Sequence, residues 1–463
     1  MRYEKDCVKD LRIAYIGGGS RDWAWCFMQD LALERQMEGV IRLYDIDREA
    51  AQHNAVIGNR ISAHAQARSR WRYEVADSLA EALDGADFVI ISILPGTFDE
   101  MESDVHAPER CGVYQAVGDT VGPGGCVRAL RTIPMYVTIA EAIREHAPQA
   151  WVINYTNPMA QCVATLYEVF PQVKAIGCCH EVFHAMDLLC CMLRDKLGVQ
   201  AQRQQLRCTL AGVNHFTWIT SAYYGGLDLF PMFAEFCREH LAEGYDETGC
   251  SLWRGDPFKS AHRALMDMFL RYGAIPAAGD RHLTEFLPPW YLKDSETVRQ
   301  WRFGLTPVSW RKEDLQARLA RSERLRTGEE EICLTPSGEE GHLIMKALLG
   351  LGDMLTNVNL PNRGQIPGLP LRAVVETNAY ISRSGVSPVM DGALPEGVLG
   401  LVMPHALNQL SVLRAAMTGD RELAFRAFLN EPLMQGVAPD EARALFAQML
   451  RSTAAYLPEA FRG

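Results

Sequence analysis

The sequence predicts an α/β fold, in which a Rossmann-type parallel sheet is followed by a C-terminal α+β domain. Over roughly the first 180 residues, short β-rich runs alternate with helical stretches, which is the pattern of βαβ units. The run 87–93 lacks polar alternation, as is typical of a strand covered on both faces. A glycine-rich turn at residues 17–19 directly follows the first of these runs.

The elements of this first part can be placed in order along the chain. We expect strands at residues 12–17, 40–44, 72–76, 87–93, 151–155 and 174–178. Helical patterns occupy residues 23–38, 48–67, 127–146, 159–170 and 181–197.

The pattern changes near residue 200. Residues 204–230 are rich in Thr, Tyr and Gly and predict antiparallel strands or hairpins. Amphipathic stretches follow at residues 339–349, 407–419 and 421–429. Because 463 residues exceed what one hydrophobic core usually holds, we expect two domains, 1–200 and 201–463, with an extensive shared interface.

Composition limits the class of partner. The formal net charge of -11 disfavours nucleic acids and anionic membrane surfaces, which call for a basic face, and favours a small molecule. The charged N-terminus has no signal-peptide pattern and no apolar run is long enough to span a bilayer, so we expect a soluble, cytoplasmic protein. Thirteen cysteines, an odd number, predict reduced thiols rather than a disulfide framework.

The turn formed by Gly17, Gly18, Gly19 and Ser20 is a candidate dinucleotide site. Glycines let the backbone approach a pyrophosphate, and the N-terminus of the helix that follows offers unpaired N–H groups to its charge. Asp45 ends the second strand, 26 positions after Gly19, where an acid binds ribose hydroxyls and favours NAD over NADP. The spacing departs from a strict G-x-G-x-x-G, so an ordinary βα turn is the alternative.

Cys179 stands where the strand at residues 174–178 gives way to a helix. The carboxyl ends of parallel strands are where ligands bind in such sheets. A single cysteine there is more often a small buried hydrophobe than a metal ligand. Its neighbours along the chain decide between these two interpretations.

Short motifs occur in a fixed order between residues 16 and 364. They are Ile16-Gly-Gly-Gly-Ser20, Thr120-Val-Gly-Pro-Gly-Gly125, Arg128-Ala-Leu-Arg-Thr-Ile-Pro134, Asn154-Tyr-Thr-Asn-Pro158, Cys179-His180, Gly212-Val-Asn-His215 and Asn359-Leu-Pro-Asn-Arg-Gly364. In this order they resemble the motifs of glycoside hydrolase family 4. The resemblance implies a fold like that of lactate and malate dehydrogenases, and glycoside hydrolysis with NAD and a divalent metal, usually manganese.

The resemblance also implies roles for individual residues. Cys179 and His215 match the family's metal ligands, and Asn157 matches a position that contacts substrate hydroxyls near the metal. Asp119 stands where relatives usually carry Glu, and we expect this shorter acid to serve as a catalytic residue of the site. The implied chemistry removes a hydride from C3 of the sugar, which acidifies the C2 proton and eases elimination at C1; water then adds and the hydride returns.

Several roles stay open. His180 either donates a proton to the departing C1 oxygen or holds a substrate hydroxyl, and Glu181 either shapes specificity or stabilises the helix that it begins. Tyr272 and Asp280 are alternative bases for the C2 proton. Candidates for binding a substrate carboxylate, with ordinary ion pairing as the alternative, are Arg281, Arg363 and Arg383.

The segment Cys179-His-Glu-Val182 resembles the α-galacturonidase branch of the family, which makes a uronide the expected substrate and a homodimer or homotetramer the expected assembly. An α-glucuronidase or another α-glycosidase is the nearest rival. A 2-hydroxy acid dehydrogenase with the same glycine-rich turn is the alternative from another class, and a non-catalytic NAD-binding protein is the third.

Overall fold

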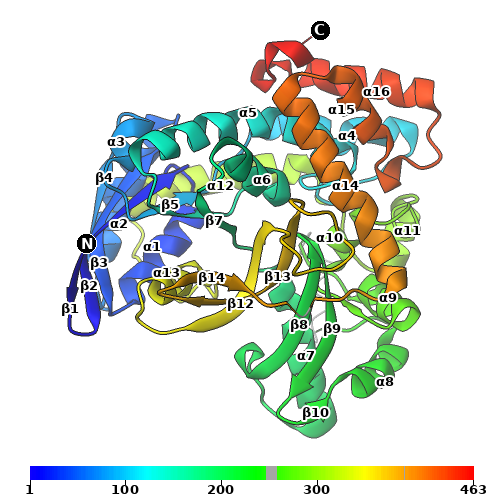
Figure 1. The fold of residues 1–463 in the computed structure, drawn as a ribbon, viewed down its shortest axis with the longest axis horizontal. Coiled ribbons are helices and arrows are strands. Elements are labelled where there is room, and N and C mark those ends of the chain that lie inside the picture. The colour runs from blue at the N-terminus through cyan, green and yellow to red at the C-terminus, as the bar shows by residue number, and fades with distance from the viewer. Residues whose placement is uncertain (247–257, 391, 463) are drawn as a thin grey trace.

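The computed structural model describes residues 1–246, 258–390 and 392–462. Its first part contains a parallel sheet with the strand order β4-β3-β2-β5-β6-β7 (Figure 1). The strands are β2 (Cys7–Ile16), β3 (Met37–Tyr44), β4 (Trp71–Val75), β5 (Phe88–Ile91), β6 (Trp151–Asn154) and β7 (Lys174–Gly177). The predicted Rossmann-type sheet is therefore confirmed, with each expected strand in place.

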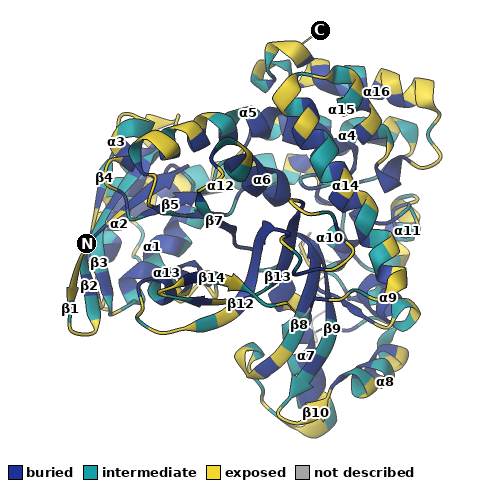
Figure 2. Ribbon diagram, in the orientation of Figure 1, coloured by how far each residue is buried: buried dark blue, intermediate teal, exposed yellow. Residues whose placement is uncertain are grey.

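Helices cover both faces of this sheet, which is why its strands are apolar on both sides. One face packs against α1 (Trp23–Leu33), α2 (Arg48–Ser62) and α13 (Gly341–Leu348). The other packs against α3 (Leu79–Leu83), α5 (Gly122–His146) and α6 (Met159–Val169). Strands β5, β6 and β7 are buried along almost their whole length, whereas β2, β3 and β4 also carry intermediate or exposed residues; Figure 2 colours each residue by its burial.

Three predicted helix bounds in the first part are wrong. The helix expected at 48–67 ends at Ser62. The helix expected at 23–38 ends at Leu33, because the Glu34 side chain accepts the N–H groups of Arg35 and Gln36 and turns the chain into β3. The helix expected to begin at 127 begins at Gly122, because Pro123 lies in its first turn, where a missing N–H costs nothing.

The sheet continues past residue 200 in antiparallel form. Asn359 of β12 lies opposite Gly177 of β7, and the path runs on through β13, β8, β9 and β10 (Figure 1). These strands are β8 (Leu206–Val213), β9 (Phe216–Tyr224), β10 (Leu227–Asp228), β12 (Met354–Pro361) and β13 (Val374–Ser382), with β1 (Arg2–Glu4), β11 (Ile275–Pro276) and β14 (Gly385–Pro388) off the path. The hairpin expected at 204–230 is confirmed, whereas the domain division near residue 200 stays a prediction, because the sheet crosses it.

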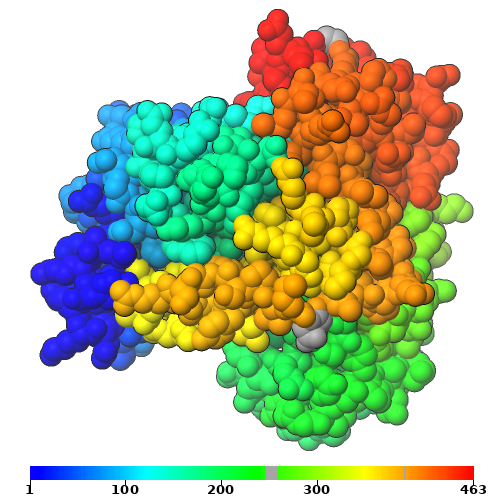
Figure 3. All heavy atoms as spheres, in the orientation of Figure 1, coloured from blue at the N-terminus to red at the C-terminus, as the bar shows by residue number. Residues whose placement is uncertain are grey.

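The remaining helices, except those at residues 98–106 and 308–327, share the largest apolar cluster with the antiparallel part. They are α4 (Phe98–His106), α7 (Glu181–Leu197), α8 (Phe230–His240), α9 (Arg263–Tyr272), α10 (Asp280–Glu285), α11 (Ser295–Trp301), α12 (Val308–Thr327), α14 (Glu396–Thr418), α15 (Arg421–Leu429) and α16 (Pro439–Ser452). In the space-filling view, the yellow and orange segments pack directly against the blue and cyan N-terminal part (Figure 3). Within the described residues, no helix is long and apolar enough to cross a membrane.

Candidate active site

The glycine-rich turn is packed tightly against the parallel sheet. Gly17 N and Gly18 N both donate to Tyr44 O, at 2.9 and 3.0 Å. Gly17 has a φ of 89°, and a Cβ there would lie 2.0 Å from Ser92 O. No larger residue fits this conformation and this space, so the turn needs glycine for its own fold.

Side chains hold the turn from the other side. The Asp45 carboxylate accepts Gly19 N at 2.8 Å, and Asn54 Nδ2 donates to Gly18 O and Ser20 O, each at 2.8 Å. No side chain caps the N-terminus of α1. The first backbone N–H groups of this helix therefore have no side-chain acceptor, and they lie next to the turn. Glycines, an uncapped helix N-terminus and a carboxylate at the second strand fit a dinucleotide. The nearby Asp47 caps α2, accepting Ala50 N at 3.0 Å.

Asp119, His215 and His282 form a second group of polar side chains. Their ligand atoms lie within 4.8 Å of one another, and the two imidazole rings are 3.9 Å apart at their centroids. Thr120 Oγ1 contacts His215 Nδ1 at 2.9 Å and donates to Asp119 Oδ1 at 2.7 Å, which fixes both groups. His215 has a φ of 63°, an unfavourable conformation for a residue with a Cβ and one that is typical of functional sites.

The protonation of this cluster follows from its charges. Burial raises the pKa of Asp119, but His282, His215 and Arg128 outweigh burial and hold the pKa well below its usual range. Burial and the neighbouring His215 lower the pKa of His282 to about 3, and burial lowers that of His215. One carboxylate and two imidazoles form a donor set that suits a divalent first-row cation.

Asn157 lies beside the cluster and contacts Asp119. Its Nδ2 donates to Asp119 Oδ2 at 3.3 Å, and its backbone oxygen accepts Arg128 Nε at 3.2 Å. Asn157 Oδ1 and His282 Nδ1 are buried, with no hydrogen-bond partner among the described residues. Buried polar atoms of this kind call for a ligand or an ion.

Cys179 lies at the carboxyl end of β7, beside Asn214, the residue that precedes His215. Burial, with the nearby Glu376 and Glu181 carboxylates, raises the pKa of its thiol well above the usual value. Beneath it, Asn357 Nδ2 donates to Cys179 O at 3.0 Å and also to Glu376. This network fixes the Cys179 backbone; every cysteine that the structure describes is a free thiol.

His180 and Glu181 begin α7 and face opposite partners. His180 Nδ1 lies 3.0 Å from Glu339 Oε1, and its ring packs on Trp23 at 5.7 Å. Glu181 Oε2 accepts Gly279 N at 3.1 Å, and Glu181 Oε1 lies 4.0 Å from His282 Nε2. Burial raises the pKa of Glu181, but the surrounding histidines outweigh burial and lower it overall. Glu181 therefore joins α7 to the segment that carries His282.

The two candidate bases lie at opposite ends of α9. Asp280 is fully buried and accepts Leu265 N at 3.0 Å and Ala264 N at 3.3 Å, at the N-terminus of that helix. Tyr272 is the last residue of α9, and its ring packs edge-on against Trp218 at 6.2 Å. Only Asp280 adjoins the segment that carries His282.

The three candidate arginines are widely separated. Arg281 is buried, and its Nη2 donates to Ala116 O at 3.3 Å and to Thr306 Oγ1. Arg363 is exposed in the loop after β12. Arg383 follows β13 at its far end and lies over the Tyr3 ring at 4.7 Å. The structure brings Arg281 to the cluster and places Arg383 away from it.

Two buried carboxylates clamp the loop that carries Asp119. Glu285 Oε1 accepts Val117 N at 2.7 Å and Gly118 N at 2.9 Å, and Glu431 Oε2 accepts Gly122 N at 2.9 Å. Burial raises the pKa of Glu285 to about 8 and that of Glu431 to about 7. The loop is thus held at both ends by carboxyl groups that are buried in the protein.

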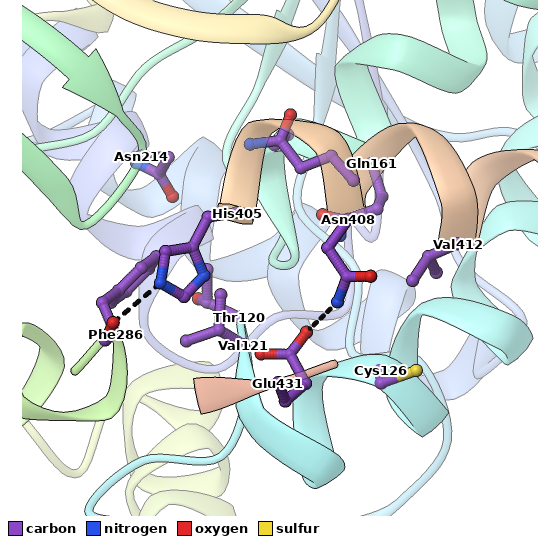
Figure 4. A pocket seen from close by; sticks show the side chains of 12 residues that line it. Thr120, Val121, Cys126, Gln161, Asn214, Phe286, His405, Asn408, Val412 and Glu431 are labelled. Atoms are coloured by element: carbon purple, nitrogen blue, oxygen red, sulfur yellow. Dashed lines mark hydrogen bonds between the residues drawn. The ribbon is translucent and has the colours of Figure 1, made fainter. Parts of the chain in front are cut away.

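A small cavity lies behind Thr120 and Asn214. Figure 4 shows Asn408 from α14 donating to Glu431 at 2.6 Å, and His405 bonded to Phe286 O at 2.7 Å. The cavity therefore separates the Asp119 loop from α14 and is lined largely by polar side chains.

Sequence reasoning missed several members of the site. His282 stands in a polar segment whose role could not be separated from that of Asp280, and Glu285 follows one helical turn later. Glu376 and Asn54 lie within ordinary strand and helix patterns. A buried polar residue inside an apolar pattern is the available signal, and it is too common to identify a site.

Comparisons with known proteins agree with this geometry. A model described as Family 4 glycosyl hydrolase matches residues 12–194, and one for the C-terminal domain of Family 4 glycosyl hydrolases matches residues 210–434. A protein of Thermoanaerobacterium saccharolyticum named alpha-galacturonidase is 56% identical over 459 residues, which cover 99% of this chain and 98% of the relative.

Solved structures show the same fold. The crystal structure of lplD from Bacillus subtilis, described as a glucosidase, has a TM-score of 0.91 at 52% identity, covering 96% of this chain and 100% of that chain. A 6-phospho-alpha-glucosidase from gut microorganisms, solved in complex with NAD and Mn2+, has a TM-score of 0.80 at 21% identity, covering 97% and 99%. At this sequence identity, the similarity to the 6-phospho-alpha-glucosidase shows a shared fold only.

Proposed function

The chain belongs to family 4 of the glycosyl hydrolases, and on that premise we propose that it is an α-galacturonidase that uses NAD and a divalent cation, with Mn2+ as the expected metal. The observation that carries the proposal is the cluster of Asp119, His215 and His282 at the carboxyl end of the parallel sheet. The α-galacturonidase of T. saccharolyticum, at 56% identity over nearly the whole length, supports the uronide substrate.

The cofactor assignment is supported by the residues present. Gly17, Gly18, Gly19 and Ser20 would hold the pyrophosphate of NAD, and Asp45 its adenosine ribose. Cys179 and His215 would hold the cation, and Asp119 and His282 lie beside His215 in one cluster. When bound, NAD supplies reversible hydride removal at a ring carbon and the cation supplies polarisation of the neighbouring sugar oxygens.

The chain's own residues bind and orient the sugar and move protons. Asn157, fixed by Asp119 and Arg128, would hold a ring hydroxyl near the cluster. His180, held by Glu339, would donate a proton to the departing C1 oxygen, and Glu181 would contribute to specificity. Asp280 and Tyr272 stay the proposed bases for the C2 proton, and the position of Asp280 beside the His282 segment favours it.

Substrate turnover tests the proposal directly. Wild-type protein with NAD and Mn2+ should hydrolyse p-nitrophenyl α-D-galacturonide faster than the α-glucuronide and the α-galactoside. Removing NAD, or removing the metal with a chelator, should each stop hydrolysis. Turnover of another glycoside without turnover of the galacturonide would contradict the substrate, and activity in a chelator would contradict the metal.

A 2-hydroxy acid dehydrogenase, the alternative from another class, predicts a net build-up of NADH. The proposed hydrolase returns the hydride in each cycle, so absorbance at 340 nm should stay constant at steady state. The same proposal includes a cytoplasmic location and a homodimer or homotetramer. The exposed side chains of Leu407 and Met417 on α14 support an interface, which sedimentation of the purified protein would test.

A further inference from the structure

Two arginines from different helices share one aromatic ring beside the candidate site. The guanidinium carbon of Arg281 lies 5.0 Å from the centroid of the Phe258 ring, and that of Arg311 lies 5.4 Å from it. The ring packs edge-on against Trp310 at 5.1 Å. Phe258 thus holds the arginines of α10 and α12 close to each other.

Among the residues that the structure describes, no carboxylate forms an ion pair with either guanidinium group. Arg281 donates to Ala116 O and Thr306 Oγ1, both uncharged, and its buried Nε has no partner among the described residues. Arg311 is half-buried and forms no ion pair or hydrogen bond within the described part of the chain. Two partly desolvated cations that form no ion pair within the described ranges would be stabilised by an anion bound between them.

The pKa shifts of the two arginines also favour an anion bound beside them. Burial and the neighbouring Arg311 lower the pKa of Arg281 to about 10, while Glu181, Glu285 and Asp119 oppose the shift. Burial lowers the pKa of Arg311, and Asp119 opposes that shift. Both groups stay cationic at neutral pH, and Glu181 and Asp119 already face histidines.

Arg281 faces a cleft that also reaches the metal-type cluster. Both Arg281 and His282 line this cleft. A sugar bound there with its hydroxyls at the His282 cluster would therefore have Arg281 on the same wall for its C6 group. Phe258 forms part of the same wall.

We propose that Arg281 and Arg311, held on the Phe258 ring, bind the C6 carboxylate of the uronide and that Arg311 determines the preference for a uronide over a neutral glycoside. The proposal rests on the proposed function. Planar guanidinium groups bind carboxylates through two parallel hydrogen bonds, which a hydroxymethyl group cannot form. Arg281 is buried and supports the Ala116 backbone, whereas Arg311 makes no such contact and is the better residue to change.

The experiment compares Arg311→Ala with the wild type and with Lys312→Ala, all loaded with NAD and Mn2+. Lys312 is the next residue of α12 but bonds to Asp99 and Glu102 at the surface, so it is a matched control. We expect Arg311→Ala to lower kcat/KM for p-nitrophenyl α-D-galacturonide by roughly 10- to 100-fold relative to the α-D-galactoside. Arg311→Lys should recover part of the loss, and Lys312→Ala should match the wild type.

Calorimetry supplies a second readout. Wild-type protein should bind free D-galacturonate more tightly than D-galactose, and Arg311→Ala should remove the difference. An equal loss for both substrates, or an unchanged ratio in both assays, would overturn the proposal. If the wild type does not hydrolyse the galacturonide, the proposed function fails, and the two binding constants alone then decide whether this pair binds a carboxylate.

Discussion

Replacing Glu285 with glutamine should make the protein more resistant to rising pH. The Glu285 side chain is fully buried; its Oε1 accepts both Val117 N and Gly118 N, and its Oε2 has no partner among the described residues. Burial raises its pKa from 4.5 to about 8; the two backbone N–H groups and Arg281 oppose the shift, and Asp119 adds to it. The folded protein therefore keeps a proton on this carboxyl at neutral pH.

The sign and size of the effect follow from that pKa. Because the folded-state value is the higher one, the proton's contribution to stability is fully present below pH 4.5 and is lost as pH rises through about 8. For a single titrating group, the free energy of unfolding cannot change by more than about 1.4 kcal/mol per pH unit. Glutamine keeps one carbonyl oxygen for both N–H groups and has no proton to lose. Between pH 6 and 8, the free energy of unfolding of Glu285→Gln should rise relative to the wild type by roughly 2 kcal/mol.

Urea unfolding followed by tryptophan fluorescence at pH 6, 7 and 8 would measure this difference. Glu285→Ala is the control: it leaves two buried N–H groups without an acceptor and should lose roughly 1–3 kcal/mol for each of them. Measured relative to the wild type, that loss should shrink by the same roughly 2 kcal/mol between pH 6 and 8, because alanine also removes the titrating carboxyl. A difference between the wild type and Glu285→Gln that stays constant from pH 6 to 8, or falls, would refute a protonated Glu285.

Three further predictions concern the cofactor and metal sites. Cys179→Ser should abolish metal-dependent hydrolysis, because an alcohol is a far poorer ligand than a thiolate, while NAD binding measured by fluorescence titration stays intact; unchanged activity would exclude Cys179 as a ligand. Gly17→Ala should lower NAD affinity at least 10-fold, because its Cβ would meet Ser92 O at 2.0 Å. Gly112→Ala is the control, because Gly112 also has a positive φ, of 72°, but its new Cβ would meet no atom within 4 Å. This variant carries the backbone strain without the clash and should leave NAD affinity unchanged. Asp45→Ala should weaken NAD binding and reduce the preference over NADP, and equal affinities for NAD before and after the change would count against its ribose contact.

Much of the parallel part follows from local pattern. The run at 87–93 is apolar on both sides because helices cover both faces, and residues 181–197 form α7 with the bounds that their periodicity predicts. The end of α1 was missed because a side-chain bond from Glu34 to the following backbone decides it. Residues 35–38 carry no local signal against a helix.

The sequence by itself determined what adjacent residues can determine: the strand-turn-helix of the glycine-rich turn, Asp45 at the end of the next strand, and the ordered motifs that contain Cys179 and His215. The tertiary structure alone decided which distant residues meet. His282 stacks on His215, Glu285 holds the loop before Asp119, and Arg311 shares a ring with Arg281. Contacts of this kind depend on how α10 packs on α9 and how α12 packs on α2 and α4. That packing is fixed by many residues together and leaves no periodic pattern near any one of them.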